Sequence, residues 1–177
     1  MKIIVINGRP RAGKDQFVNF CKAHTNWCLN ISTVDFVKEV AEHCGWDGTK
    51  TPENRKLLSD LKDLLTKWND VPYKKVCREI QLFKSRMEIF GFNPKEDGIV
   101  FIHCREPKEI ERLCKDLGAE SLLMLRAAVE DEEQSNHADA EVFNYNYDYT
   151  ISNDGTLEDL EEAAVRFLGE MKIKISE

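Results

Sequence analysis

The N-terminal segment constrains this chain more than any other. An apolar run, Lys2-Ile3-Ile4-Val5-Ile6-Asn7, leads directly into Gly8-Arg9-Pro10-Arg11-Ala12-Gly13-Lys14. This order predicts a buried β-strand, a tight turn bounded by two glycines and then a helix, which is the layout of the phosphate-binding pattern G-x-x-x-x-G-K. Gly8 and Gly13 permit backbone angles and close approaches that a Cβ atom would forbid.

The loop is suited to a nucleoside triphosphate. Its backbone N–H groups are expected to point at a phosphate chain, and the helix N-terminus adds partial positive charge. Lys14 brings a mobile full charge for the β- and γ-phosphates. Arg11 is a second cation in the loop. Its side chain either contacts phosphate or points into water, and the sequence favours neither alternative. The expected nucleotide-binding residues are Gly8, Arg11, Ala12, Gly13, Lys14, Asp15 and Gln16.

Position 15 departs from the usual pattern, because Asp15 stands where Ser or Thr is common. A hydroxyl there would bind Mg²⁺, and a carboxylate is a better Mg²⁺ ligand in terms of charge, directly or through water. Alternatively, Asp15 is a first-turn acid that interacts favourably with the helix dipole. Both roles are compatible, and Asp15 is our candidate metal ligand.

Composition narrows the class of protein. The 177 residues predict one domain, 1–177, with a full core and normal apolar content. The net charge of −7 disfavours nucleic-acid binding. No apolar run approaches membrane-span length, and the N-terminus is typical of a core strand rather than of a signal peptide. The six cysteines form no C-x-x-C pair and no zinc-like spacing, which predicts buried, reduced thiols in a cytoplasmic protein.

Strand-like and helix-like patterns alternate along the chain. Helical patterns include 106–117 and 156–168, the second with Thr156 as its cap. The apolar runs are mostly continuous rather than alternating, as in a sheet covered on both faces. Such alternation of strands and helices implies a parallel sheet with ligands at the carboxyl ends of the strands. The predicted strands are 3–6, 29–34, 99–104, 122–125 and 147–151.

A helical insertion, about 46–92, lies between the second and third predicted strands. One helix starts at Thr51-Pro52, the chain breaks at 69–72, and a second helix follows. This insertion either covers a second substrate or simply packs against the core, and the polar segment of about 128–146 is expected to act as a short lid. The spacing of apolar residues predicts a buried stripe on each helix. The first stripe is Leu57, Leu58, Leu61, Leu64, Leu65 and Trp68, and the second is Val76, Ile80, Phe83 and Met87.

With these residues in hand, the chain resembles P-loop kinases of the deoxynucleoside monophosphate kinase-like group over nearly its whole length. The likeness rests first on Gly13-Lys14-Asp15, because G-K-D is typical of those kinases and of animal-type phosphomevalonate kinases. Lys38 lies in a segment similar to their P-L-K-E-x-A, and Arg105 matches the arginine of their D-V-R-x-x-x-E. Residues 148–155 are similar to their D-x-x-I-x-N-x-G-T-L tail. Further matches are Gly45-Trp46-Asp47-Gly48, Arg55, Leu61-Lys62, Trp68-Asn69-Asp70, Glu109 and Arg126.

The resemblance implies a P-loop NTPase fold, an α/β three-layer sandwich whose five-stranded parallel sheet is flanked by helices. It also implies an ATP-dependent nucleotide kinase that transfers the γ-phosphoryl group of ATP, with Mg²⁺, to a (deoxy)nucleoside monophosphate. Many relatives of this kind dimerise, so a homodimer is an expected assembly. Lys14, Arg105 and Arg126 would stabilise the transferring group. The acceptor would contact Asp35, Lys38, Arg55, Trp68, Asn69, Asp70 and Arg105.

Several of these residues have simpler interpretations. Lys38 and Arg55 are equally well explained as surface cations, and a core position is favoured over a stacking platform for Trp68. Asn69-Asp70 is also a plain cap and turn. Asp35 is either a base toward a hydroxyl group or, as favoured here, the N-cap of the next helix.

One departure from the family leaves two rival functions open. The acid that precedes the third-strand arginine in these kinases corresponds to His103, so a Mg²⁺ ligand is missing at that place. The first rival is a P-loop kinase for another small phosphorylated or hydroxylated acceptor, phosphomevalonate kinase-like or nucleoside kinase-like, with Asp35 as base. The second is a nucleotide-binding module without transfer activity.

Overall fold

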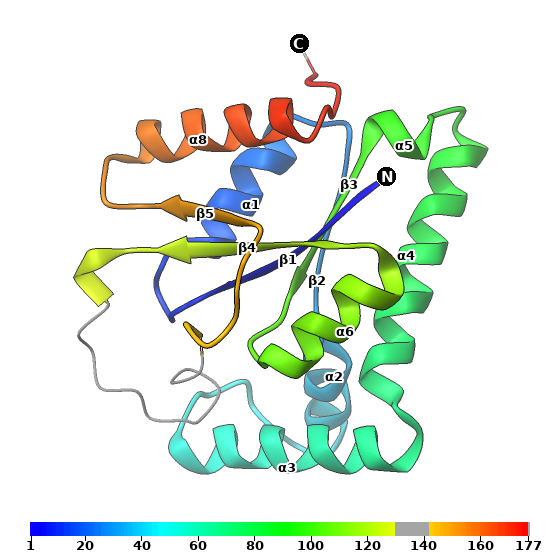
Figure 1. The fold of residues 1–177 in the computed structure, drawn as a ribbon. Helices are drawn as coiled ribbons and strands as arrows, with labels where there is room; N and C mark the ends of the chain where they lie inside the picture. Colours follow the sequence, from blue (N-terminus) through cyan, green and yellow to red (C-terminus); the bar gives the residue numbers. More distant parts are fainter. Residues whose placement is uncertain (130–141, 177) are drawn as a thin grey trace.

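A five-stranded, wholly parallel sheet forms the centre of the molecule, in the strand order β2-β3-β1-β4-β5 (Figure 1). The computed structural model describes residues 1–129 and 142–176. The five predicted strands are confirmed, with ends that differ by one or two residues. The strands are β1 (Lys2–Gly8), β2 (Trp27–Ser32), β3 (Gly98–His103), β4 (Glu120–Leu125) and β5 (Tyr149–Ser152).

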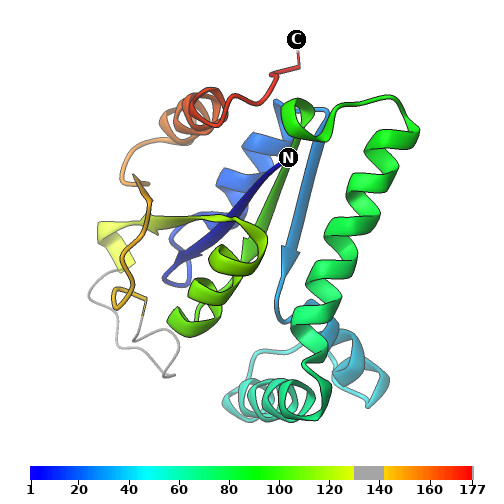
Figure 2. The ribbon, with the colours of Figure 1, turned by 45° about the vertical axis from the view of Figure 1, so that its right-hand side comes forward.

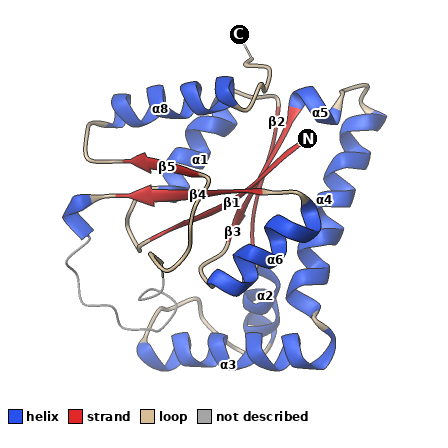
Figure 3. Ribbon diagram, in the orientation of Figure 1, coloured by secondary structure: helices blue, strands red, loops and turns tan. Residues whose placement is uncertain are grey.

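Helices cover both faces of this sheet, which gives the predicted α/β three-layer sandwich (Figure 3). Helices α1 and α8 pack on one face, and α4 and α6 pack on the other. Short α5 precedes β3, and the 3-10 turn η1 follows β4. The bounds are α1 (Lys14–Ala23), α2 (Asp35–His43), α3 (Pro52–Asn69), α4 (Val71–Ile89), α5 (Pro94–Asp97), α6 (Pro107–Leu117), η1 (Ala127–Val129) and α8 (Leu157–Glu170).

The core has two parts, one on each side of the sheet. On the α1/α8 side, Phe17, Phe101 and Phe167 lie with ring centroids 5.7 to 6.4 Å apart. On the other side, the predicted stripe of α4 is confirmed, with Val76, Ile80, Phe83 and Met87 all buried. The central strands are almost wholly buried, whereas the edge strands β2 and β5 are only partly covered. The continuous apolar pattern therefore holds for the centre of the sheet, and β5 alternates as an edge strand does.

Of the two long inserted helices, α3 crosses the end of the sheet at which β2 and β3 finish, and α4 runs back along the sheet face (Figure 2). Thr51 caps α3 by accepting a hydrogen bond from the Asn54 N–H group, and Asp70, with φ of 53°, separates α3 from α4. The predicted buried stripe of α3 is wrong. Leu64 is 63% exposed and Trp68 is 80% exposed, so Trp68 is not a core residue. Helix α3 packs on α2 and α4, and its Lys62 side chain reaches Glu106 and Glu109 at the start of α6.

Within the described ranges, no helix is both long enough and apolar enough to cross a lipid bilayer.

Candidate functional site

The loop between β1 and α1 has the backbone that the motif predicts. Gly8 has φ of 147° and Gly13 has φ of 93°, both in the region that glycine tolerates best. A Cβ atom at Gly8 would lie 2.5 Å from the Met124 carbonyl oxygen, and one at Gly13 would collide with the Asn153 amide nitrogen. The Asn153 amide also donates to the Ala12 carbonyl at 3.0 Å. The loop is therefore held tightly between β4 and the β5–α8 connection.

Lys14 lies across this loop. Its Nζ atom donates to the carbonyl oxygens of Gly8 at 2.6 Å and Arg9 at 2.7 Å. Gly13 is the N-cap of α1, and no side chain of the described residues caps that helix. The first amides of α1 and the Lys14 ammonium group together form a positive region suited to an anion.

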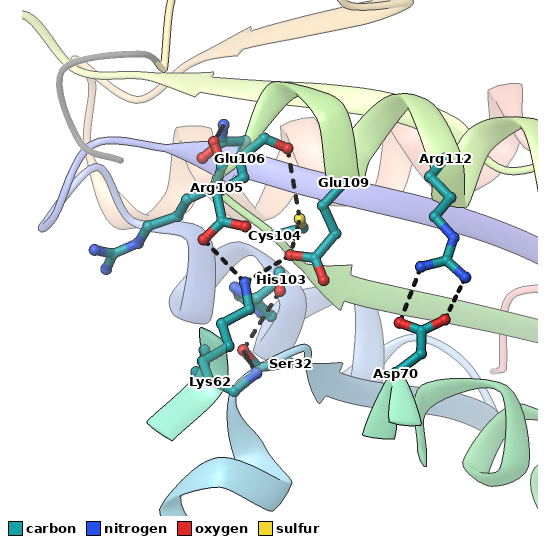
Figure 4. Close-up of polar contacts among 11 residues, drawn as sticks. Ser32, Lys62, Asp70, His103, Cys104, Arg105, Glu106, Glu109 and Arg112 are labelled. Carbon is teal, nitrogen blue, oxygen red and sulfur yellow. Dashed lines mark hydrogen bonds and ion pairs between the residues drawn. The ribbon is translucent and has the colours of Figure 1, made fainter. Parts of the chain in front are cut away.

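Arg126 reaches the same loop from the end of β4. Its guanidinium donates to the Arg11 carbonyl at 3.3 Å, and Arg11 itself adopts a left-handed backbone with φ of 65°. Arg105 is the second residue after β3, and its carbonyl accepts from the Asn7 amide at 3.3 Å. The Arg105 side chain is exposed and, in Figure 4, points away from the side chains of Lys62 and Glu109. Both predicted arginines therefore lie at the carboxyl edge of the sheet. The hydrogen bond to the Arg11 carbonyl joins Arg126 to the loop.

Asp15 and His103 lie next to each other at this edge. The Asp15 side chain is 89% exposed, and its Oδ1 atom is 3.8 Å from Nε2 of His103. Burial lowers the pKa of the His103 imidazole below its ordinary value, although the carboxylate of Asp15 opposes this effect. The described residues contain no group of three or more histidine, cysteine, aspartate or glutamate side chains that could hold a metal ion. Asp15 and His103 are thus a pair rather than a complete metal centre.

Asp35 does not act as the predicted N-cap. Val34 is the N-cap of α2, and Asp35 lies in the first turn of that helix. Its carboxylate accepts from the Ser32 N–H group at 2.7 Å and from Lys38 Nζ at 3.3 Å. The side chain therefore tethers the start of α2 to the end of β2, and Lys38 is paired with it.

The acceptor candidates on α3 are dispersed rather than gathered. Arg55 and Trp68 are both exposed on this helix. Asn69 accepts from Lys74 Nζ at the turn into α4. Asp70 accepts from both terminal nitrogens of Arg112 on α6, at 3.0 Å for its Oδ1 atom (Figure 4). Asn69 and Asp70 thus have contacts that explain them as structural residues of the α3–α4 turn.

A second polar cluster was not identified from the sequence as a unit. Lys62, the only α3 residue classed as buried, donates to Glu106 at 3.0 Å and to Glu109 at 2.7 Å (Figure 4). Cys104 Sγ lies 3.3 Å from Glu109 Oε2. Burial acts to lower the pKa of the Lys62 ammonium group, but the charges of Glu109 and Glu106 outweigh it and raise that pKa. The sequence places these partners more than forty residues apart, and no local pattern connects them.

The sequence motif does not identify two further residues, Asn7 just before the loop and Arg9 within it. Asn7, which is fully buried, donates to the Tyr147 hydroxyl at 2.7 Å and accepts from the Gly8 N–H group at 2.8 Å. Arg9 donates to the Val129 carbonyl at 3.1 Å and lies 5.0 Å from the centre of the Phe143 ring. Most of the predicted lid, residues 130–141, lies outside the described residues. Arg9 therefore contacts the described residues on both sides of that segment.

Comparison with known proteins agrees with this architecture. No family model matches the chain, and no curated protein matches it. TT1252 from Thermus thermophilus is similar in structure, with a TM-score of 0.53 and 20% identity over 96% of this chain and 97% of its own. The tunicamycin resistance protein of Deinococcus radiodurans has a TM-score of 0.52 and 11% identity, with coverage of 99% and 98%.

A third similar structure is dephospho-CoA kinase from Campylobacter jejuni, with a TM-score of 0.50 and 11% identity over 96% of this chain and 97% of its own. At such low identity these likenesses establish the fold alone. The chain has the P-loop NTPase fold, with the glycine-bounded loop between β1 and α1 at the carboxyl edge of a five-stranded parallel sheet.

Proposed function

We propose that this protein is an ATP-dependent nucleotide kinase that transfers the γ-phosphoryl group of ATP to a (deoxy)nucleoside monophosphate. The observation that carries the proposal is the convergence of two cations on one loop. Lys14 bonds to the carbonyls of Gly8 and Arg9, and Arg126 bonds to the carbonyl of Arg11. Phosphoryl transfer depends on positioning and charge neutralisation more than on a base, and this loop supplies both.

Each side chain would have a distinct role. The amides from Gly13 to Gln16 would bind the phosphate chain, and Lys14 would leave the loop carbonyls to neutralise charge on the γ-phosphoryl group. Arg126 would stabilise the same group from β4, and Arg105 would bind the acceptor phosphate from β3. The resemblance to monophosphate kinases supports a nucleotide as the acceptor.

A divalent cation would accompany ATP. The resemblance points to Mg²⁺, and the Asp15 carboxylate at the first turn of α1 would suit that hard cation, whereas the neighbouring His103 imidazole would not. Such an ion neutralises charge on the phosphates when bound. The cytoplasmic location and the homodimer stay predictions.

Phosphorylation assays with a panel of acceptors would test this function. We expect ADP release from ATP to rise when a nucleoside monophosphate is added, and Lys14→Ala to reduce the rate by at least about a hundredfold, because a preorganised charge at the transferring group is lost. If no acceptor raises ADP release above the Lys14→Ala background, the protein is a nucleotide-binding module rather than a kinase.

Non-nucleotide acceptors belong in the same panel. If only alcohols or other phosphorylated metabolites are phosphorylated, the protein is a kinase for that class of acceptor and not for nucleoside monophosphates. The Asp35→Asn variant then shows whether Asp35 is a catalytic base or a structural residue that joins α2 to β2. A base role predicts a loss of about a hundredfold or more in kcat, whereas loss of the contacts to Ser32 and Lys38 would mainly lower stability.

A further inference from the structure

One imidazole nitrogen at the carboxyl edge of the sheet is buried and makes no hydrogen bond. It is Nε2 of His103, the last residue of β3, whose side chain is only 17% exposed. Among the described residues, only this atom and Nε of Arg9 are buried side-chain nitrogens or oxygens without a hydrogen-bond partner. Buried polar atoms are normally satisfied, so an orphaned atom next to a phosphate-binding loop indicates a missing ligand.

The backbone that carries this ring is held in place on both sides. The His103 carbonyl accepts from the Thr33 N–H group at 3.2 Å and from Ser32 Oγ at 3.4 Å, and the residue pairs with Ile6 of β1. Asp15, by contrast, has an exposed side chain that can rotate. The site therefore combines a largely buried nitrogen donor on a paired strand with an adjustable oxygen donor.

The separation of the two donors suits a shared ion. Nε2 of His103 and Oδ1 of Asp15 are 3.8 Å apart, which is too long for a hydrogen bond. An ion bound about 2.1 Å from each atom brings the two donors to about 3.0 Å in octahedral and about 3.4 Å in tetrahedral coordination. Rotation of the exposed Asp15 side chain by less than about 1 Å at its carboxylate would close this difference while the backbone stays in place.

The donor types discriminate among metals. Carboxylate and phosphate oxygens suit Mg²⁺, but an imidazole nitrogen suits cobalt, nickel, zinc and other first-row transition metals far better. The protein supplies only this pair within the described residues, so the remaining ligands would be nucleotide phosphates and water.

We propose that Asp15 and His103 together hold a first-row transition-metal ion beside the nucleotide phosphates, in preference to Mg²⁺. This inference rests on the proposed nucleotide site, because two protein ligands do not complete the coordination of such an ion. It also gives a role to His103, which stands where the kinases that the chain resembles have an acid.

Metal binding can be measured without turnover. The full-length protein, loaded with a non-hydrolysable ATP analogue, is titrated with Co²⁺ and with Mg²⁺ by calorimetry, and the Co²⁺ complex is followed by its visible absorption. Free analogue gives the intrinsic preference of the phosphates. We expect the protein complex to favour Co²⁺ over Mg²⁺ by at least about tenfold more than free analogue does.

Variants identify the ligands. His103→Asn and Asp15→Ala should each reduce this extra preference by about tenfold or more, and His103→Asp should shift it toward Mg²⁺. Asp15 is exposed, so its variant tests the site even if a change at position 103 impairs folding, which thermal melting reveals. His24→Asn is the matched control, because His24 lies at the opposite end of α1 and pairs with Glu161.

The outcomes separate the two proposals. If the analogue binds in the presence of EDTA, and Lys14→Ala weakens it, but His103→Asn keeps the full Co²⁺ preference, the metal inference is overturned and the nucleotide site stands. The inference is equally overturned if the wild-type preference equals that of free analogue. If the analogue does not bind at all, the proposed function fails and the metal inference fails with it.

Discussion

At the residue scale, Gly13 links the sequence motif to the geometry of the loop. Its φ of 93° is unfavourable for other residues, and a Cβ atom would collide with the Asn153 side chain. We expect Gly13→Ala to lower the free energy of unfolding by about 1–3 kcal/mol and to weaken nucleotide binding strongly. Urea denaturation and titration with a fluorescent ATP analogue measure the two effects.

Gly169 gives the matched control for this substitution. It lies in α8, and a Cβ atom there would meet no other atom within 4 Å. Gly169→Ala should leave nucleotide binding unchanged and raise stability by about 0.5 kcal/mol, because glycine is a poor helix former. Equal stability of Gly13→Ala and the wild type would show that the loop is less constrained than its geometry indicates.

Single residues also show where sequence reasoning stopped. The roles of Gly8, Gly13 and Lys14 in the loop geometry could be anticipated because they belong to one contiguous motif. The sequence favours Asp35 as an N-cap, but α2 begins one residue earlier than that role requires, and the Asp35 carboxylate accepts from the Ser32 N–H group. The unpaired nitrogen of His103 depends on tertiary packing at the end of β3, which no local pattern encodes.

At the scale of elements, the ion pairs of Lys62 join the inserted helix α3 to α6. Lys62 is 11% exposed and Glu109 is 17% exposed. We expect Lys62→Met to lower the free energy of unfolding by about 2–4 kcal/mol, since it leaves the Glu109 carboxylate buried without its cation. Lys56→Met on the same helix is the control, because its pair with Asp60 is largely exposed, and it should change stability by less than about 0.5 kcal/mol.

The pH dependence of this difference has a definite sign. The pKa of Lys62 is raised in the folded protein, so its contribution is complete below the ordinary lysine pKa of about 10.4 and declines as pH rises through the folded value. The gap between the wild type and Lys62→Met in chemical denaturation should therefore stay constant from pH 7 to about 10. A gap that closes within this range would contradict the ion-pair explanation.

The same helix explains the main error in predicting elements. Helical periodicity correctly predicts that α3 and α4 form and where the chain breaks at Asp70. It cannot tell whether an apolar stripe meets a partner, and on α3 the side chains of Leu57, Leu64 and Trp68 stay exposed. The residue that packs most deeply is Lys62, since its acidic partners come from a distant part of the chain.

At the scale of the whole molecule, strand order follows from pairing between segments that are far apart in the chain. The alternation of strands and helices predicts a parallel sheet, and the order β2-β3-β1-β4-β5 appears only in the structure. This order brings the ends of β1, β3 and β4 together, so that Lys14, His103 and Arg126 meet at one edge. The neighbourhood of the site was thus predictable in outline, but its contacts were not.

The two layers of core on either side of the sheet can be probed through the cysteines, all six of which are free. Cys21 lies in the layer of α1 and α8, and Cys104 lies in the layer of α4 and α6. Burial raises the pKa of both thiols, and that of Cys28 to about 12, so little reactive thiolate forms at these positions. Cys44 is exposed at the end of α2.

We therefore expect N-ethylmaleimide to modify Cys44 first in the folded protein, and Cys21 and Cys104 only after unfolding. Peptide mass spectrometry at increasing reaction times measures the order, and the same reaction in urea gives the rates for the unfolded chain. If both layers form one cooperative core, Cys21 and Cys104 should become reactive at the same urea concentration. Labelling of Cys104 at a lower urea concentration than Cys21 would instead show that the layer of α4 and α6 unfolds before the layer of α1 and α8.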